Sequence, residues 1–153
     1  MLGAFKARGF FTADQKERIM DAIRQAEDQT SGEIRVHVET SAGGREPMAR
    51  AQTVFDALGM ARTELRNGVL IYLAVSDRKF AILGDQGINQ VVPEHFWEEI
   101  KDRMHDLFTE GRFVEGITSG ILSVGEHLKR HFPCQSDDVN ELCDDISEGN
   151  IGH

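Results

Sequence analysis

The feature that most constrains this chain is an unbroken apolar run, Gly68–Val75 (GVLIYLAV). An apolar run of this length, bounded by turn residues, is typical of a strand covered on both faces, as in the centre of an α/β sheet. The short polar stretch SDRK follows it, and a second apolar stretch, Phe80–Gly84, comes next. This spacing predicts an antiparallel hairpin formed by the two stretches.

Another strand is predicted at Glu33–Thr40, because apolar and polar residues alternate there with a period of two. That alternation indicates a half-buried strand near an edge of the sheet. A helix is predicted between this strand and the central one, since Pro47 suits a first helical turn and apolar residues recur after it at helical spacing. A strand, a crossover helix and a second strand place the two strands parallel.

Three more helices are predicted around the sheet. The first begins after Thr12, which can form a capping box with Gln15. The second follows Pro93 and runs to about Thr109, and the third spans Phe113–Phe132. Three glycines of this last helix are expected to let it approach the sheet closely: Gly116, Gly120 and Gly125. The predicted fold class is α/β, a three-layer α/β/α sandwich of Rossmann-like type, with a small mixed sheet and helices on both faces.

Charge and hydropathy argue against several kinds of partner. The chain has 153 residues, with 26 acidic residues against 17 lysines and arginines, a net charge of −9. This balance argues against nucleic acid and against anionic membrane surfaces. No apolar run reaches the roughly 18 residues needed to span a bilayer, and the amino terminus lacks the pattern of a signal peptide. The sequence therefore predicts a cytoplasmic protein with no nucleic-acid partner and no direct membrane insertion.

The composition changes after Pro133. Residues 134–153 are acidic and contain few large apolar side chains. We predict a folded domain at residues 1–133 and an acidic carboxy-terminal tail at residues 134–153. The tail region carries the chain's two cysteines, Cys134 and Cys143, which are expected to stay reduced in a cytoplasmic protein.

Polar side chains are predicted to gather where the strands end. One rim of the sheet would hold Glu33, Asn67 and Asp85, and the opposite rim would hold Asp77. Carboxylate and amide oxygens are the ligands that Ca²⁺ prefers. We therefore predict a calcium site with Glu33, Asn67 and Asp85 as the first set of ligands and Asp77 as the alternative. The competing interpretation is that Asn67 and Asp77 serve turns, and that Asp85 caps a following turn.

Other patterns give weaker indications. His127 and His131 share one face of the last predicted helix, which suits zinc, but a third and a fourth ligand at a known spacing are missing. The sequence contains no phosphate-binding glycine loop, no nucleophile elbow and no zinc-protease motif. Whether the protein is an enzyme is therefore left open by its motifs.

Three segments resemble the TPM domain family, which is named for a thylakoid lumen phosphatase, a photosystem II repair protein and an acetylcholine-receptor modulator. They are SGEIRVHVE, NGVLIYLAVSDRKFAILGDQGIN and the FxxGxFxxGIxxGI run at Phe108–Ile121. The resemblance covers roughly Thr12–Phe132 and implies the same α/β/α sandwich. Because the signal peptide and membrane anchor of many members are missing here, it points to a soluble, single-domain branch.

The resemblance also implies chemistry, since some TPM members are described as calcium binders and some as weak acid phosphatases. The family's NGV–DR–GDxG pattern matches here at Asn67, Asp77 and Asp85. Three hypotheses follow from the sequence and the resemblance together. The chain is a module that binds a divalent cation, calcium first; or a metal-assisted phosphatase acting on phosphate monoesters; or an interaction domain whose acidic surface or tail binds a basic protein partner.

Overall fold

The computed structural model describes residues 10–93 and 95–134. Its elements, in chain order, are α1 (Ala13–Glu27), β1 (Glu33–Glu39), α2 (Pro47–Ala57), the 3-10 helix η1 (Met60–Arg62), β2 (Gly68–Ala74), β3 (Lys79–Gly84), α3 (Gln86–Asn89), α4 (Phe96–Thr109) and α5 (Phe113–His131). The predicted helices and strands are present, and α1 begins at the predicted capping box of Thr12 and Gln15. The four-residue helix α3 was not predicted.

The sheet has the order β1-β2-β3, with β1 parallel and β3 antiparallel to the central β2. Every residue of β2 is buried, which confirms that Gly68–Val75 marks the central strand. The position of β1 at an edge is confirmed as well. The register places Glu33 opposite Gly68 and Val69 opposite Gly84.

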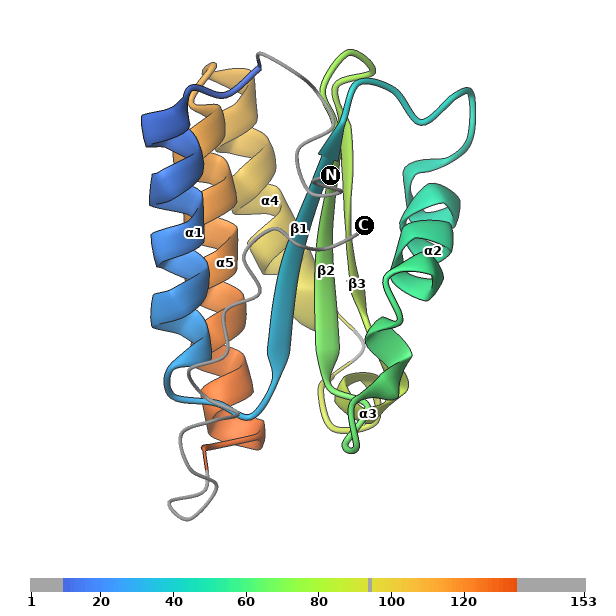
Figure 1. Cartoon of the computed structure of the whole chain (residues 1–153), viewed down its shortest axis with the longest axis vertical. Coiled ribbons are helices and arrows are strands. Elements are labelled where there is room, and N and C mark those ends of the chain that lie inside the picture. The colour runs from blue at the N-terminus through green and yellow to red at the C-terminus, as the bar shows by residue number, and fades with distance from the viewer. Residues whose placement is uncertain (1–9, 94, 135–153) are drawn as a thin grey trace.

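Helices cover both faces of the sheet, as Figure 1 shows: α1, α4 and α5 lie on one side and α2 lies on the other. Alternate residues of β2 therefore point into two separate apolar clusters. Ile71 packs in the cluster shared with α1, α4 and α5, whereas Leu70 packs in the cluster shared with α2. This arrangement confirms the predicted three-layer α/β/α sandwich.

The glycines of α5 have a different role from the predicted one. A side chain at Gly116 would meet the ring of Phe108, and one at Gly120 would meet Met104. These neighbours belong to α4, and the neighbour of Gly125 is Ala26 of α1. The small residues therefore bring α5 close to the helices beside it in its own layer and not to the sheet, so that prediction is wrong.

Gly125 provides a test of this close helix contact. A Cβ atom at this position would lie 2.6 Å from the Cβ of Ala26 and 3.0 Å from its Cα. This steric overlap can be removed only if α1 itself shifts. Overpacking of this kind costs about 1–3 kcal/mol, and leucine's better helix propensity returns about 1 kcal/mol. We expect Gly125→Leu to lower the free energy of unfolding by about 1 kcal/mol in a urea titration. Leucine at the exposed neighbour Glu126 is the control, and equal losses in the two variants would contradict the contact.

Two predictions concern features at the edges of the described chain. Cys134 is disulfide-bonded, so the prediction that the thiols stay reduced is wrong for this residue. Disulfides are rare in the cytosol, and a cytoplasmic location remains a prediction. The tail predicted at residues 134–153 lies, apart from Cys134, outside the described residues.

In the described part of the chain, no helix is both long enough and apolar enough to cross a bilayer.

Candidate functional site

The rim beside α3 brings the backbone of the first three predicted ligands together. The amide of Glu33 donates to the carbonyl of Asn67 at 3.4 Å, at the start of the β1–β2 pairing. The amide of Asp85 donates to the carbonyl of Gly68 at 2.9 Å, at the end of β3. Glu33, Asn67 and Asp85 thus come from three segments and lie at one end of the sheet, the lower end in Figure 1. We call this end the Asp85 rim.

Asp85 is the most constrained of these side chains. It is only 7% exposed, and its Oδ1 accepts from the amide of Gln86 at 2.8 Å, which caps α3. Both carboxylate oxygens also accept from the guanidinium of Arg66, from Nε at 2.7 Å and from Nη2 at 2.9 Å. The hydrogen bonds to Asp85 raise the pKa of Arg66 above its ordinary value. The capping role is therefore present, together with an arginine partner that the sequence did not reveal.

Glu33 and Asn67 also have protein partners. The carboxylate of Glu33 accepts from Nη2 of Arg35 at 2.8 Å, and Asn67, which is buried, donates from Nδ2 to Ser31 Oγ at 3.3 Å. Each carboxylate of the rim is thus neutralised by its own arginine. Within residues 10–93 and 95–134, no three His, Cys, Asp or Glu side chains lie together in a way that could hold a metal ion. A cation at this rim would have to take the place of an arginine and complete its shell with other oxygens.

Backbone oxygens lie against the first turn of α3, which Asp85 caps. The amide of Gly87 donates to the carbonyl of Arg66 at 2.9 Å, so the first turn of α3 sits against the Leu65–Arg66 backbone. A Cβ atom on Gly87 would lie 2.0 Å from the oxygen of Leu65 and 2.6 Å from that of Arg66. Only glycine fits this position. The rim therefore combines a buried carboxylate with two carbonyl oxygens, which are the donor types that Ca²⁺ takes.

Asp77 lies at the opposite rim, in the turn between β2 and β3. Its Oδ2 accepts from the amide of Ala42 at 2.8 Å, and both of its oxygens accept from Ser41 Oγ at 3.2 Å. These bonds hold the loop between β1 and α2. Asp77 is therefore not brought together with the other three predicted ligands.

The histidine pair of α5 has an apolar setting. His127 packs edge-on against the ring of Phe96, with 4.6 Å between the ring centroids. Burial lowers the pKa of His127 below its ordinary value, which favours the neutral ring. The geometry matches aromatic packing between α4 and α5.

A buried polar network on the α2 side of the sheet was missed by the sequence analysis. Glu39 is 6% exposed and accepts from Arg50 through Nε at 2.7 Å and Nη2 at 2.9 Å. The hydroxyl of Tyr72 also donates to Glu39, and Nε2 of His37 lies 3.3 Å from its Oε1. We call these four residues the Glu39 network. It joins β1, β2 and α2, and it explains why the polar face of β1 is more buried than its alternation predicted.

The contacts of the Glu39 network keep Glu39 charged and Tyr72 neutral. Burial alone would raise the pKa of Glu39, but the hydrogen bonds from Arg50 and Tyr72 outweigh it and lower the pKa to about 2. Burial, followed by the bond to Glu39, raises the pKa of Tyr72. Tyr72 therefore stays a neutral donor and Glu39 a charged acceptor, an arrangement that fixes α2 on the sheet. The only sequence signal was a tyrosine inside an otherwise aliphatic strand.

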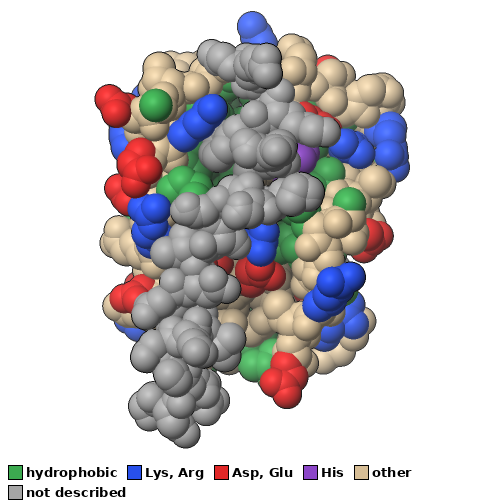
Figure 2. Space-filling model, viewed as in Figure 1, with side chains coloured by type: hydrophobic (Ala, Val, Ile, Leu, Met, Phe, Trp, Pro, Cys, Tyr) green, Lys and Arg blue, Asp and Glu red, His purple; other side chains and the backbone are tan. Residues whose placement is uncertain are grey.

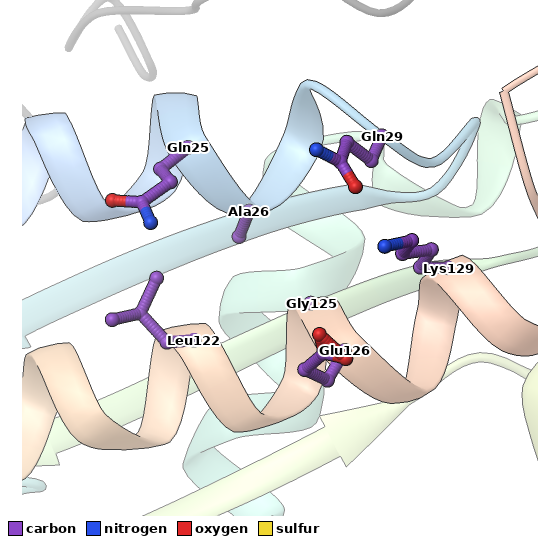
Figure 3. A pocket seen from close by; sticks show the side chains of 7 residues that line it. All are labelled: Gln25, Ala26, Gln29, Leu122, Gly125, Glu126 and Lys129. Carbon is purple, nitrogen blue, oxygen red and sulfur yellow. The ribbon is translucent and has the colours of Figure 1, made fainter.

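A hollow of about 270 Å³ lies between α1 and α5. Figure 3 shows the side chains that line it: Gln25, Ala26, Gln29, Leu122, Gly125, Glu126 and Lys129. Its two charged groups, Glu126 and Lys129, have opposite signs, and the rest are amides or small and apolar groups. Because the lining mixes both charges with amides and apolar groups, it does not favour a ligand of one charge or polarity.

Comparisons with known proteins place the fold in a family. A family model described as the TPM domain matches residues 5–127. The chain belongs to the TPM domain family. A search of curated proteins found no match.

The fold of this chain is also found in solved structures of other bacterial proteins. The chain is 45% identical to the BA42 protein of the psychrophilic bacterium Bizionia argentinensis, with a TM-score of 0.82 over 93% of this chain and 97% of that one. The fold of this chain is also similar to that of the N-terminal domain of the cg2496 protein of Corynebacterium glutamicum, at 18% identity and a TM-score of 0.64, over 78% of this chain and 75% of that one. The N-terminal domain of a P. gingivalis protein matches at 22% identity and a TM-score of 0.66, over 81% and 80%. The last two comparisons show the fold alone.

Proposed function

We propose that this TPM domain binds a divalent cation, Ca²⁺ in preference to Mg²⁺, at the Asp85 rim. The observation that carries the proposal is the position of Asp85, a buried carboxylate at a strand end whose positive partner is a half-exposed arginine side chain. A guanidinium that is 40% exposed can leave for water, and the carboxylate it leaves behind favours another cation.

The surroundings of Asp85 suit calcium better than magnesium. The carbonyls of Leu65 and Arg66 and the side chain of Asn67 are neutral oxygen donors on the same rim. Calcium accepts six to eight oxygens in irregular geometry, whereas magnesium requires a near-ideal octahedron. Glu33 remains a further candidate ligand, on condition that it gives up Arg35.

The interaction hypothesis requires an acidic surface or tail, and the described residues of the face drawn in Figure 2 do not present such a surface. Figure 2 shows acidic and basic side chains interspersed on the described part of this face, not a continuous acidic area. The acidic tail of that hypothesis lies outside the described residues. The phosphatase and interaction hypotheses both stay predictions.

Calcium binding can be tested by thermal unfolding with and without the ion. Ligand at a hundredfold excess over its dissociation constant adds about 2.7 kcal/mol to the stability of the folded state. For a chain of this length we expect the Tm to rise by roughly 5–10 °C. Asp85→Asn should abolish most of this rise while leaving the fold intact, because asparagine is also a good helix cap.

Asp77→Asn is the matched control, because it removes one carboxylate from the opposite rim. It should keep the calcium-induced rise in Tm. A rise that persists in Asp85→Asn and disappears in Asp77→Asn would move the site to the opposite rim. No rise in the wild type would refute cation binding at either rim.

A further inference from the structure

The turn that carries Arg66 is held in place by its backbone. The amide of Arg66 donates to the carbonyl of Thr63 at 3.1 Å, and its own carbonyl accepts from Gly87 at 2.9 Å. The next amide, that of Asn67, donates to Thr63 Oγ1 at 3.1 Å. Because bonds on both sides of Arg66 fix its backbone, the side chain can move without unfolding the turn.

Arg66 has a left-handed backbone, with φ at +53°. Among the described residues, the one other non-glycine residue with positive φ is Arg78, at +55° in the β2–β3 turn. Glycine and asparagine adopt this conformation more readily than arginine does. The backbone therefore gives no reason for an arginine at position 66, and the side-chain contact with Asp85 does.

That contact occupies the atoms that a cation would need. The guanidinium binds Oδ1 and Oδ2 of Asp85 at once, in the paired geometry that arginine forms with carboxylates. The third bond to this carboxylate comes from the amide of Gln86 and fixes its orientation. A hard cation and the guanidinium of Arg66 would thus compete for one prepositioned carboxylate.

We propose that Arg66 is the built-in competitor of the cation and sets the affinity of the Asp85 rim. This inference rests on the proposed function and adds its regulation. With Arg66 bound to Asp85 the carboxylate is satisfied, and filling the site takes a higher concentration of free cation than it would without Arg66. The apparent affinity equals the intrinsic affinity multiplied by the fraction of molecules in which Arg66 has left Asp85. Binding also releases the guanidinium to the solvent beside α3.

The test compares calcium dissociation constants, measured by isothermal titration calorimetry, for the wild type, Arg66→Asn and Arg78→Asn. Asparagine suits a left-handed backbone in both turns, so the two variants differ in which rim loses an arginine. We expect the dissociation constant of Arg66→Asn to fall at least tenfold and that of Arg78→Asn to equal the wild-type value. In the Asp85→Asn background, the change at position 66 should no longer affect calcium binding.

The possible outcomes separate the inference from the proposed function. Equal dissociation constants in the wild type and Arg66→Asn overturn the competition and leave cation binding standing. Binding by Arg66→Asn alone supports the competition and overturns cation binding as a property of the wild type. No binding by any of the proteins overturns both.

Two further measurements apply if Arg66→Asn fails to fold. Arg66→Lys keeps the charge but loses the paired contact, so its dissociation constant should fall below the wild-type value. In the wild type, the Nε–H resonance of Arg66 should move toward the position of a solvent-exposed arginine as calcium is added. A resonance that stays unchanged while calcium binds would overturn the inference.

Discussion

Ile71→Asp should prevent the chain from folding, and Leu70→Asp should do the same from the other face of β2. The two side chains are 1% and 0% exposed, and they point into the two separate apolar clusters of the domain. Burying an unpaired carboxylate costs several kcal/mol, and the lost apolar contacts add about 2–5 kcal/mol. The whole stability of a domain is only about 5–15 kcal/mol. Circular dichroism and one-dimensional NMR of the purified variants would therefore show an unfolded chain.

Lys79→Asp is the control for this prediction. Lys79 is exposed at the start of β3, next to the same hairpin turn, so an aspartate there stays in water. Its free energy of unfolding should remain within about 0.5 kcal/mol of the wild type. Cooperative melting of either β2 variant, at a Tm near that of Lys79→Asp, would contradict the position of β2 between two helical layers.

The fold was predictable because its signals are local and repeated. The apolar run of β2 fixes a strand buried on both faces, and the short SDRK turn fixes the direction of β3. The neighbours of the α5 glycines could not be predicted in the same way. Periodicity shows which face of a helix is buried, but not whether a sheet or another helix covers that face. The four-residue α3 is too short to show any periodicity at all.

The chemistry of the rims was less predictable, because it depends on pairs that are distant in sequence. Strand direction alone was enough to bring Asp85 to the same rim as Glu33. Its partner Arg66 comes 19 positions earlier, on a left-handed turn that no sequence pattern signals. The ion pair between Glu39 and Arg50 joins a strand to a helix in the same way. Which residues pair at such sites depends on the tertiary structure. No short motif in the sequence reveals these pairs.

The Glu39 network gives the second large expected effect. Arg50→Met should lower the free energy of unfolding by about 2–4 kcal/mol, because it leaves the charge of Glu39 buried without its cation. Arg50→Met/Glu39→Gln should be more stable than this single variant by at least about 1 kcal/mol. Glutamine removes the buried charge and still accepts the hydroxyl proton of Tyr72. Urea titrations at neutral pH measure both differences in the free energy of unfolding. A double variant less stable than Arg50→Met would contradict the role of Arg50 as the partner of the buried Glu39 charge.

The pH dependence of stability gives an independent reading of the same pair. The pKa of Glu39 is about 2 in the folded protein, below its ordinary value of 4.5. A carboxyl group with a lowered folded pKa stabilises the protein above the unfolded pKa, and this contribution is lost as pH falls from about 4.5 to about 2. In Arg50→Met, burial without the arginine should raise the pKa of Glu39, so protonation then favours the folded state. The stability difference between the wild type and Arg50→Met should therefore shrink steadily between pH 5 and pH 2. A difference that stays constant over this interval would mean that Arg50 acts through packing of its aliphatic stem and not through its charge on Glu39.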